Sequence, residues 1–120
     1  MQIFLIINAI AYLALGLWCA LAPQKAAEAV GFTLKGQQGI AEFVAVYGGL
    51  EFSIGLICLF LFLNPDFHRI GIAGLAIFYG SIVCFRSYAL IKFGQDISQG
   101  WYFFGFEIIS FILSLLLLRK

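Results

Sequence analysis

The chain alternates between long apolar stretches and shorter polar segments. Four apolar stretches run over residues 2–22, 40–63, 69–92 and 100–118. Each is close in length to the roughly 20 residues that an α-helix needs to cross a hydrocarbon core about 30 Å thick. The sequence lacks the segments of alternating apolar and polar residues, each about ten residues long, that are typical of membrane β-barrels. The pattern therefore predicts an all-α integral membrane protein with four transmembrane helices.

The polar segments predict how these helices follow one another. Pro23 ends the first helix, because proline cannot continue a helix interior. A short interfacial helix is predicted at residues 25–30. Asn64-Pro65-Asp66 is a strong turn signal, and residues 94–98 form a short connection. Short connections favour antiparallel neighbours, so we expect an up-down-up-down four-helix bundle.

Composition supports a membrane protein and narrows its partners. The chain has 120 residues, of which 63% are hydrophobic and 11% are charged, whereas soluble domains are about half apolar and about a quarter charged. This length fits one domain, so we expect residues 1–120 to form a single transmembrane domain. The net charge is +1 and no basic run is present, so we expect membrane lipid and no nucleic acid as a partner.

Polar and small residues gather on one stripe of each predicted helix, at about 100° of rotation per residue. We expect these stripes to face the bundle interior, because unpaired polar groups are costly in lipid. The stripes are Asn8, Tyr12, Gly16 and Cys19; Tyr47, Gly48, Glu51 and Gly55; Tyr79, Val83, Arg86 and Leu90; and Glu107, Ser110, Phe111 and Ser114.

Four ionisable residues lie inside the apolar stretches: Glu42, Glu51, Arg86 and Glu107. A charge at the bilayer centre costs about 2.5–3.5 kcal/mol, so such residues are candidates for a functional site. At 1.5 Å of rise per residue, Arg86 and Glu107 lie about 9 Å and about 10 Å below the same membrane surface. We therefore predict an Arg86–Glu107 ion pair. Glu51 is then a surplus acid, which we expect to be protonated unless water or a cation reaches it.

The candidate ligand-binding residues are these four together with two tyrosines: Arg86, Glu107, Glu51, Tyr47, Glu42 and Tyr79. Several alternatives stay open. The Arg86–Glu107 pair could serve only to tie two helices together, and the tyrosines could only pack. Glu42 and Glu51 are nine residues apart, which places them on opposite faces of a straight α-helix, so Glu42 could instead cap the helix or reach the headgroups. Gly48 and Gly49 are expected to provide close packing or a local kink.

No pattern for a specific chemistry is present in the sequence. His68 is the one histidine and lies in a predicted turn, which argues against haem ligation and a catalytic triad. Cys19, Cys58 and Cys84 form no C-x-x-C pair, which argues against a disulfide framework or a zinc site. We therefore predict no catalytic residue, no metal and no cofactor, and an enzyme is the less favoured interpretation.

The segment Glu42-Phe43-Val44-Ala45-Val46-Tyr47-Gly48-Gly49 resembles the E-x-x-A-x-Y-G-G signature of an uncharacterised branch of the DoxX-like small four-helix membrane proteins. Arg86-Ser87 and Glu107 extend the resemblance along the chain. It implies a four-helix bundle in a bacterial inner membrane, with these residues as the polar motif. Relatives carry an arginine where this chain has Val44, a departure that removes a partner for Glu42. Some DoxX-like proteins resemble subunits of quinone-linked oxidoreductases, and eukaryotic relatives resemble assembly chaperones for membrane proteins.

The orientation of the helices is weakly indicated. Three basic residues lie on each side of the membrane, Arg69, Arg119 and Lys120 against Lys25, Lys35 and Lys92. The positive-inside rule therefore gives a tie. We expect both termini in the cytoplasm, because four-span proteins often place them there.

Three functions remain in competition. The first is binding, and in its wider form transport, of a lipophilic or amphipathic small molecule at the intramembrane Arg/Glu site. A transporter of this size would need a homo-oligomer, and rows of small residues such as Ala41-Ala45-Gly49-Ser53 would suit either that contact or packing within the bundle. The alternative is an accessory or assembly subunit that pairs with a partner membrane protein. The third, and least favoured, is a membrane enzyme acting with quinone.

Overall fold

A computed structural model describes residues 1–94 and 101–120 of the chain. The described residues are mostly helical and contain no strand, so the all-α prediction is confirmed. Among them, four helical spans are long and apolar enough to cross a membrane: Gln2–Leu21, Gly36–Leu63, Pro65–Phe93 and Trp101–Leu118. This is the helix inventory expected of a four-helix membrane bundle. The predicted connection at 95–98 and the predicted first residue of the last helix, residue 100, lie outside the described residues.

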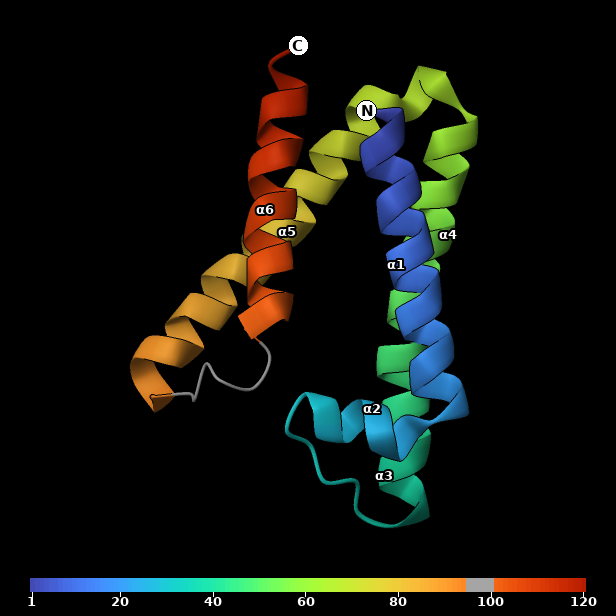
Figure 1. Cartoon of the computed structure of the whole chain (residues 1–120), viewed down its shortest axis with the longest axis vertical. Helices are drawn as coiled ribbons and strands as arrows, with labels where there is room; N and C mark the ends of the chain where they lie inside the picture. The colour runs from blue at the N-terminus through green and yellow to red at the C-terminus, as the bar shows by residue number, and fades with distance from the viewer. Residues whose placement is uncertain (95–100) are drawn as a thin grey trace. The chain divides into compact units, whose positions relative to one another are not determined.

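The chain divides into two compact units, Met1–Pro65 and Asp66–Lys120. The first unit contains α1 (Gln2–Leu21), α2 (Pro23–Ala29), and a second span built from α3 (Gly36–Phe43), a π-helical turn η1 (Val44–Gly48) and α4 (Gly49–Leu63). Within this unit α1 and α4 lie side by side and run antiparallel (Figure 1). The first unit is therefore a helical hairpin with a short helix, α2, in its connection.

The connection of the first unit follows the expected pattern with one shift. The interfacial helix α2 begins at Pro23, two residues before the predicted start, because proline fits the first turn of a helix, where no intrahelical partner for its amide is needed. After α2 the chain turns at Gly31, which has a φ of 83°. The amides of Gly31 and Phe32 bond back to the carbonyls of Glu28 and Ala27, at 3.0 and 2.8 Å, which closes the helix end.

The second span starts earlier than hydropathy alone predicts. It begins at Gly36 and not near residue 40. The helix therefore includes the polar segment Gly36-Gln37-Gln38-Gly39, which precedes the apolar stretch. Gln38 Nε2 donates to Glu42 Oε1 at 3.1 Å, one helical turn further along, and such i, i+4 pairs stabilise an exposed helical turn.

The second unit begins within η2 (Pro65–Phe67) and contains α5 (His68–Phe93) and α6 (Trp101–Leu118). Within this unit α5 and α6 pack on each other and run antiparallel (Figure 1). α5 ends at Gly94, which has a φ of 60° and whose amide donates to the Leu90 carbonyl at 3.1 Å. A left-handed residue after the last helical turn is the common way to end a helix, and glycine adopts it without a Cβ penalty.

The polar stripes of α1 and α6 are the buried faces of their helices. Asn8, Tyr12, Gly16 and Cys19 are all buried on α1, and Asn8 Nδ2 donates to the Phe4 carbonyl at 2.8 Å. On α6 the buried residues are Glu107, Ser110 and Ser114. Each helix therefore turns its polar groups toward its neighbour, as a helix in lipid requires, and on α1 they share that face with the apolar Phe4 and Leu5.

Candidate functional site

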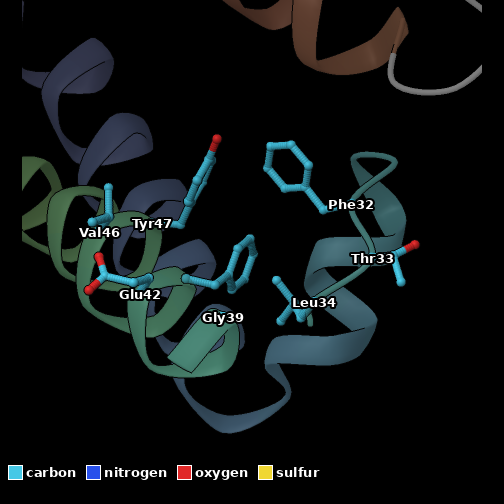
Figure 2. Close-up of a pocket in the computed structure, with 8 residues that line it drawn as sticks. Phe32, Thr33, Leu34, Gly39, Glu42, Val46 and Tyr47 are labelled. Carbon is cyan, nitrogen blue, oxygen red and sulfur yellow. The ribbon is translucent and has the colours of Figure 1, made fainter. Parts of the chain in front are cut away.

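The first unit contains an open cavity of about 320 Å³ at the end of the helical pair where α2 and α3 lie. Its walls come from the segment between α2 and α3, from α3 itself and from the π-helical turn η1 (Figure 2). The cavity is lined by Phe32, Thr33, Leu34, Gly39, Glu42, Phe43, Val46 and Tyr47. This volume lies at the lower end of the range found for small-molecule sites, about 300–1,000 Å³.

Three aromatic rings form the central part of this lining. The rings of Phe43 and Tyr47 stack with their centroids 4.8 Å apart. The Phe32 ring meets Tyr47 edge-on at 5.4 Å and Phe43 at 6.3 Å. Phe43 is buried, whereas Phe32 and Tyr47 are 42% and 41% exposed. The cluster is therefore held by a buried ring at its base and presents two rings that a bound molecule could contact.

The π-helical turn sets the direction of the cavity-lining residues on the second span. The Gly49 amide donates to the Val44 carbonyl, five residues back, as well as to the carbonyls of Ala45 and Val46. A π-helical turn takes up one more residue than an α-helical turn, which rotates the residues before it by about 100° relative to those after it. Such turns frequently occur at functional sites.

This turn corrects one expectation from the sequence. Opposite faces for Glu42 and Glu51 followed from nine residues of uninterrupted α-helix, and η1 lies between them. A wide turn shifts the helical repeat by up to one residue, or about 100°, so nine residues with η1 among them no longer place Glu42 and Glu51 half a turn apart.

Glu42 lies at one edge of the cavity. Its side chain and that of Val46 are on one side of the lining, and Phe32, Thr33 and Leu34 are on the other (Figure 2). The Glu42 carboxylate is exposed and points away from Phe32. It accepts the hydrogen bond from Gln38, and no basic residue among those described lies within ion-pair distance of it.

The second unit holds the predicted ion pair between α5 and α6. Arg86 Nε donates to Glu107 Oε2 and Arg86 Nη2 donates to Glu107 Oε1, both at 2.6 Å. The two bonds are parallel, which is the strongest geometry for an arginine and a carboxylate. The Glu107 side chain is 11% exposed and the Arg86 side chain is 33% exposed. The pair thus neutralises two charges within the membrane span, with the guanidinium at its accessible side.

Tyr79 lies on the same helix as Arg86 and belongs to the core of the second unit. It is fully buried, and its ring contacts the Phe78 and Phe106 rings edge-on, with centroids 5.2 and 6.2 Å away. Gly80, the next residue, brings α5 close to Phe111 of α6: a Cβ at this position would come within 2.9 Å of the Phe111 ring. Tyr79 therefore has a packing role in this helical pair.

The six candidate residues fall into two pairs and two single residues. Glu42 and Tyr47 line the cavity, and Arg86 and Glu107 form the ion pair. Tyr79 is buried on α5 in the second unit, and Glu51 lies half-buried on α4 in the first unit. Its convergence with Arg86 stays a prediction.

The two glycines of the motif differ in their surroundings. A Cβ on Gly48 would lie 3.5 Å from the Gly16 carbonyl oxygen of α1 and 3.6 Å from Cys19, so Gly48 is at the contact of α1 with the second span. Gly49 faces open space, with nothing within 4 Å of the position that a Cβ would take. Among residues 1–94 and 101–120, no group of three or more His, Cys, Asp or Glu side chains is placed to hold a metal ion.

The aromatic part of the cavity was missed from the sequence. Phe32, Leu34, Gly39 and Phe43 were not predicted, because a charge within an apolar stretch was the feature that marked a candidate. Two signals could have indicated them: Phe43 and Tyr47 are four residues apart on a predicted helix, and Phe32 is an aromatic residue within a polar segment.

The fold and these two sites define a small helical membrane protein with an aromatic cavity in one helical pair and a bidentate ion pair in the other. A family model described as "Domain of unknown function (DUF4345)" matches residues 1–118. The chain therefore belongs to the DUF4345 family. Neither the curated proteins nor the solved structures contain a match to this chain.

Proposed function

We propose that this protein binds a lipophilic or amphipathic small molecule in the membrane, and in a wider form of the proposal transports it. The observation that carries the proposal is the cavity of about 320 Å³. Its lining is aromatic and aliphatic apart from Glu42, Thr33 and the Tyr47 hydroxyl, which is the composition expected of a site for a small apolar body with one polar group. A lipophilic compound such as a quinone belongs to this class.

The position of the cavity supports an amphipathic ligand in particular. α3 extends the second span beyond its apolar stretch, so the cavity lies where the apolar part of the span ends. A molecule bound there would keep its apolar part against the rings and its polar group near the headgroups. The exposed faces of Phe32 and Tyr47 suit this arrangement, because aromatic side chains favour the boundary between hydrocarbon and water.

Photoaffinity labelling tests the proposal. The protein, in nanodiscs, is treated with a neutral alkyl diazirine probe and the labelled peptides are mapped by mass spectrometry. We expect saturable labelling of the segments 32–34 and 42–47. Gly39→Leu should reduce it several-fold, because the new side chain enters the cavity while its Cβ makes only an ordinary contact, 3.7 Å from the Leu34 backbone.

Gly74→Leu is the matched control, since Gly74 is on α5 and faces open space. It introduces the same side chain outside the cavity, and labelling should stay at the level of the unaltered protein. Equal labelling of the Gly39→Leu and unaltered proteins would count against the cavity as the binding site.

One observation favours a second function, that of an accessory or assembly subunit. The Arg86 side chain is 33% exposed although it is paired with Glu107 inside a membrane span. A guanidinium at this depth gains from being covered by protein, because lipid offers it no hydrogen-bond partner. A partner membrane protein that docks over the pair would supply that cover.

Co-purification separates the second function from the first. A larger complex extracted in mild detergent, and lost in Glu107→Ala, would support the accessory role. A stable species containing only this chain would argue against it. Such a species, if it contained several copies, would instead support the homo-oligomer that we propose for a transporter, because four short helices are few for a complete transport path.

The relationship to a further family, the cellular location and the orientation in the membrane are likewise proposals. We infer a relationship to the DoxX-like proteins from the helix 2 motif and the paired Arg86 and Glu107, and with it a bacterial inner membrane location. Both termini would lie on the same side of the membrane, since four spans return the chain to the side on which it started, and we place that side in the cytoplasm because four-span proteins often have this orientation. Cysteine labelling of single-cysteine variants at residues 2 and 120 in intact cells would test this orientation.

A further inference from the structure

We propose that the ligand of the aromatic cavity is a cation: an amine or quaternary ammonium group attached to an apolar body, with the positive group held at the Glu42 edge. This inference rests on the proposed function and adds the charge of the ligand to it. It depends on which charged groups line the cavity, on the faces that the rings present and on the partners that Glu42 has.

The charge of the lining is the first step. Among residues 1–94 and 101–120, Glu42 is the one residue of the lining that carries a formal charge, and it is negative. No lysine, arginine or histidine of this described part of the chain lines the cavity. An anionic ligand would therefore bring its charge next to a carboxylate with no neutralising group on the wall, whereas a cation would be attracted to it.

The state of the Glu42 carboxylate is the second step. It accepts one described hydrogen bond, from the neutral amide of Gln38, and a carboxylate can accept about four. Lys35 is the basic residue closest to it in the sequence, and the two side chains form no ion pair. The carboxylate thus has both charge and acceptor capacity left for a ligand.

The rings provide the third step. The faces of aromatic rings carry partial negative charge, and a cation within about 6 Å of a ring centroid is attracted to them. Phe32 and Tyr47 are the two exposed rings of the cluster, and their edge-on contact at 5.4 Å leaves them at an angle of 76° to each other. Two rings at such an angle form two walls of a corner. The Tyr47 wall lies on the Glu42 side of the cavity (Figure 2), so a positive group at that edge has one ring beside it.

The Glu42 carboxylate and the aromatic rings together define one orientation of the ligand in the cavity. In this proposal the apolar body lies against Leu34 and the buried Phe43. The positive group lies at the edge formed by Glu42 and Val46, and the exposed Glu42 side chain turns from its outward direction (Figure 2) to meet it. In this arrangement the carboxylate selects the sign of the charge and the rings select an apolar, polarisable body. A neutral lipophile would use the rings alone and bind more weakly.

Two probes of the same shape and opposite charge test the inference. Tetraphenylphosphonium and tetraphenylborate are titrated calorimetrically into the protein in a non-ionic detergent. We expect saturable binding of the cation about tenfold or more tighter than that of the anion. Glu42→Gln should weaken binding of the cation by about two- to fivefold, the size expected for an ion pair made by an exposed carboxylate, and should leave binding of the anion unchanged or stronger.

Two further variants serve as controls, one outside the cavity and one that keeps the charge at position 42. Glu28→Gln removes the same charge from the exposed surface of α2, outside the lining, and should leave the preference for the cation unchanged. Glu42→Asp keeps the charge and should retain most of that preference. Because Glu42 is exposed, neither change at this position removes a core contact, and circular dichroism should show an unaltered helical content.

The outcomes separate the two proposals. If both probes bind with similar affinity, Glu42→Gln has no effect, and Phe32→Leu weakens both, the cavity binds lipophiles and only the preference for a cation is wrong. If neither probe binds saturably, or if binding is unaffected by both Phe32→Leu and Gly39→Leu, the cavity is not the ligand site and both proposals fail. Phe85→Leu, at an exposed ring outside the cavity, is the control for loss of an aromatic side chain.

Discussion

The helical pair of the first unit and that of the second are held together by different kinds of contact. α1 and α4 approach so closely that a Cβ on Gly16 would lie 2.7 Å from the backbone nitrogen of Phe52, and one on Gly55 would lie 2.7 Å from that of Leu13. α5 and α6 have one such position, Gly80, which faces a side-chain ring. They are joined in addition by the Arg86–Glu107 pair.

The two helical pairs illustrate two ways in which helices associate in lipid, where the hydrophobic effect does not favour their association. In the first unit, backbones meet at glycines and the gain is van der Waals contact, which depends on the absence of a side chain at two positions. In the second, a charge-assisted pair spans the two helices and depends on both partners being present. The first kind of contact should be sensitive to added volume, and the second to the loss of either charge.

The largest effect is expected from Gly16→Leu. Its side chain would overlap the backbone of Phe52, which cannot move aside as a flexible side chain could, and overpacking of this kind costs about 3 kcal/mol. The free energy of unfolding, measured by titration with a denaturing detergent, should fall by about this amount. Gly74→Leu, at an open position, should change it by less than about 0.5 kcal/mol. Equal losses in the two variants would contradict the close contact of α1 and α4.

Arg86→Met should cost about 2 kcal/mol in the second unit, because it leaves the Glu107 carboxyl, 11% exposed, without the guanidinium. This loss of stability is expected to be smaller than that for a fully buried ion pair, because a third of the Arg86 side chain is exposed. The double variant Arg86→Met with Glu107→Met should recover part of the loss. A double-mutant cycle should give a coupling of about 0.6–1.7 kcal/mol, and a coupling of zero would remove the pair as a source of stability.

Arg86→Lys should have a smaller effect, a loss of about 1 kcal/mol. The charge remains, but an ammonium group cannot donate the two parallel bonds that Arg86 makes to Glu107. Arg69→Lys is the matched control, because Arg69 is exposed and forms no ion pair with a described residue. The same detergent titration should detect no change there. If both variants lost the same stability, the bidentate geometry would not matter.

The smallest effect is expected from Gly49→Ala, with the opposite sign. Gly49 is helical and faces open space, so the added methyl group should raise the free energy of unfolding by about 0.5 kcal/mol through the reduced flexibility of the unfolded chain. Gly16→Ala, measured alongside, should destabilise. A loss of stability in Gly49→Ala would mean that another helix covers this face in the membrane.

The transmembrane helices could be predicted because their cause is local. A run of about 20 apolar residues has few alternatives to a helix in lipid, and the first helix, predicted at 2–22, is found at Gln2–Leu21. The Arg86–Glu107 pair could be predicted for a similar reason. A constant rise per residue sets the depth of each side chain, and antiparallel neighbours bring equal depths together.

The cavity could not be predicted in the same way. It joins Phe32, from the segment after α2, to Phe43 and Tyr47 on the second span, and hydropathy does not indicate which rings will meet across a turn. The π-helical turn η1 changes the direction of Glu42 and depends on how the Gly49 amide is shared among the carbonyls of Val44, Ala45 and Val46. A single helical repeat along the whole span places Glu42 opposite Glu51, and the wide turn breaks that repeat.

The amino-acid sequence by itself determined that this chain is helical, that four of its segments suit a membrane, and which charges share a depth, because each of these follows from hydrophobicity and a fixed helical rise. Only the tertiary structure decided that an aromatic cavity forms beside Glu42 and which rings line it. The cavity depends on how the segment after α2 packs against the second span and on how one helical turn widens, and these depend on contacts between residues far apart in the chain.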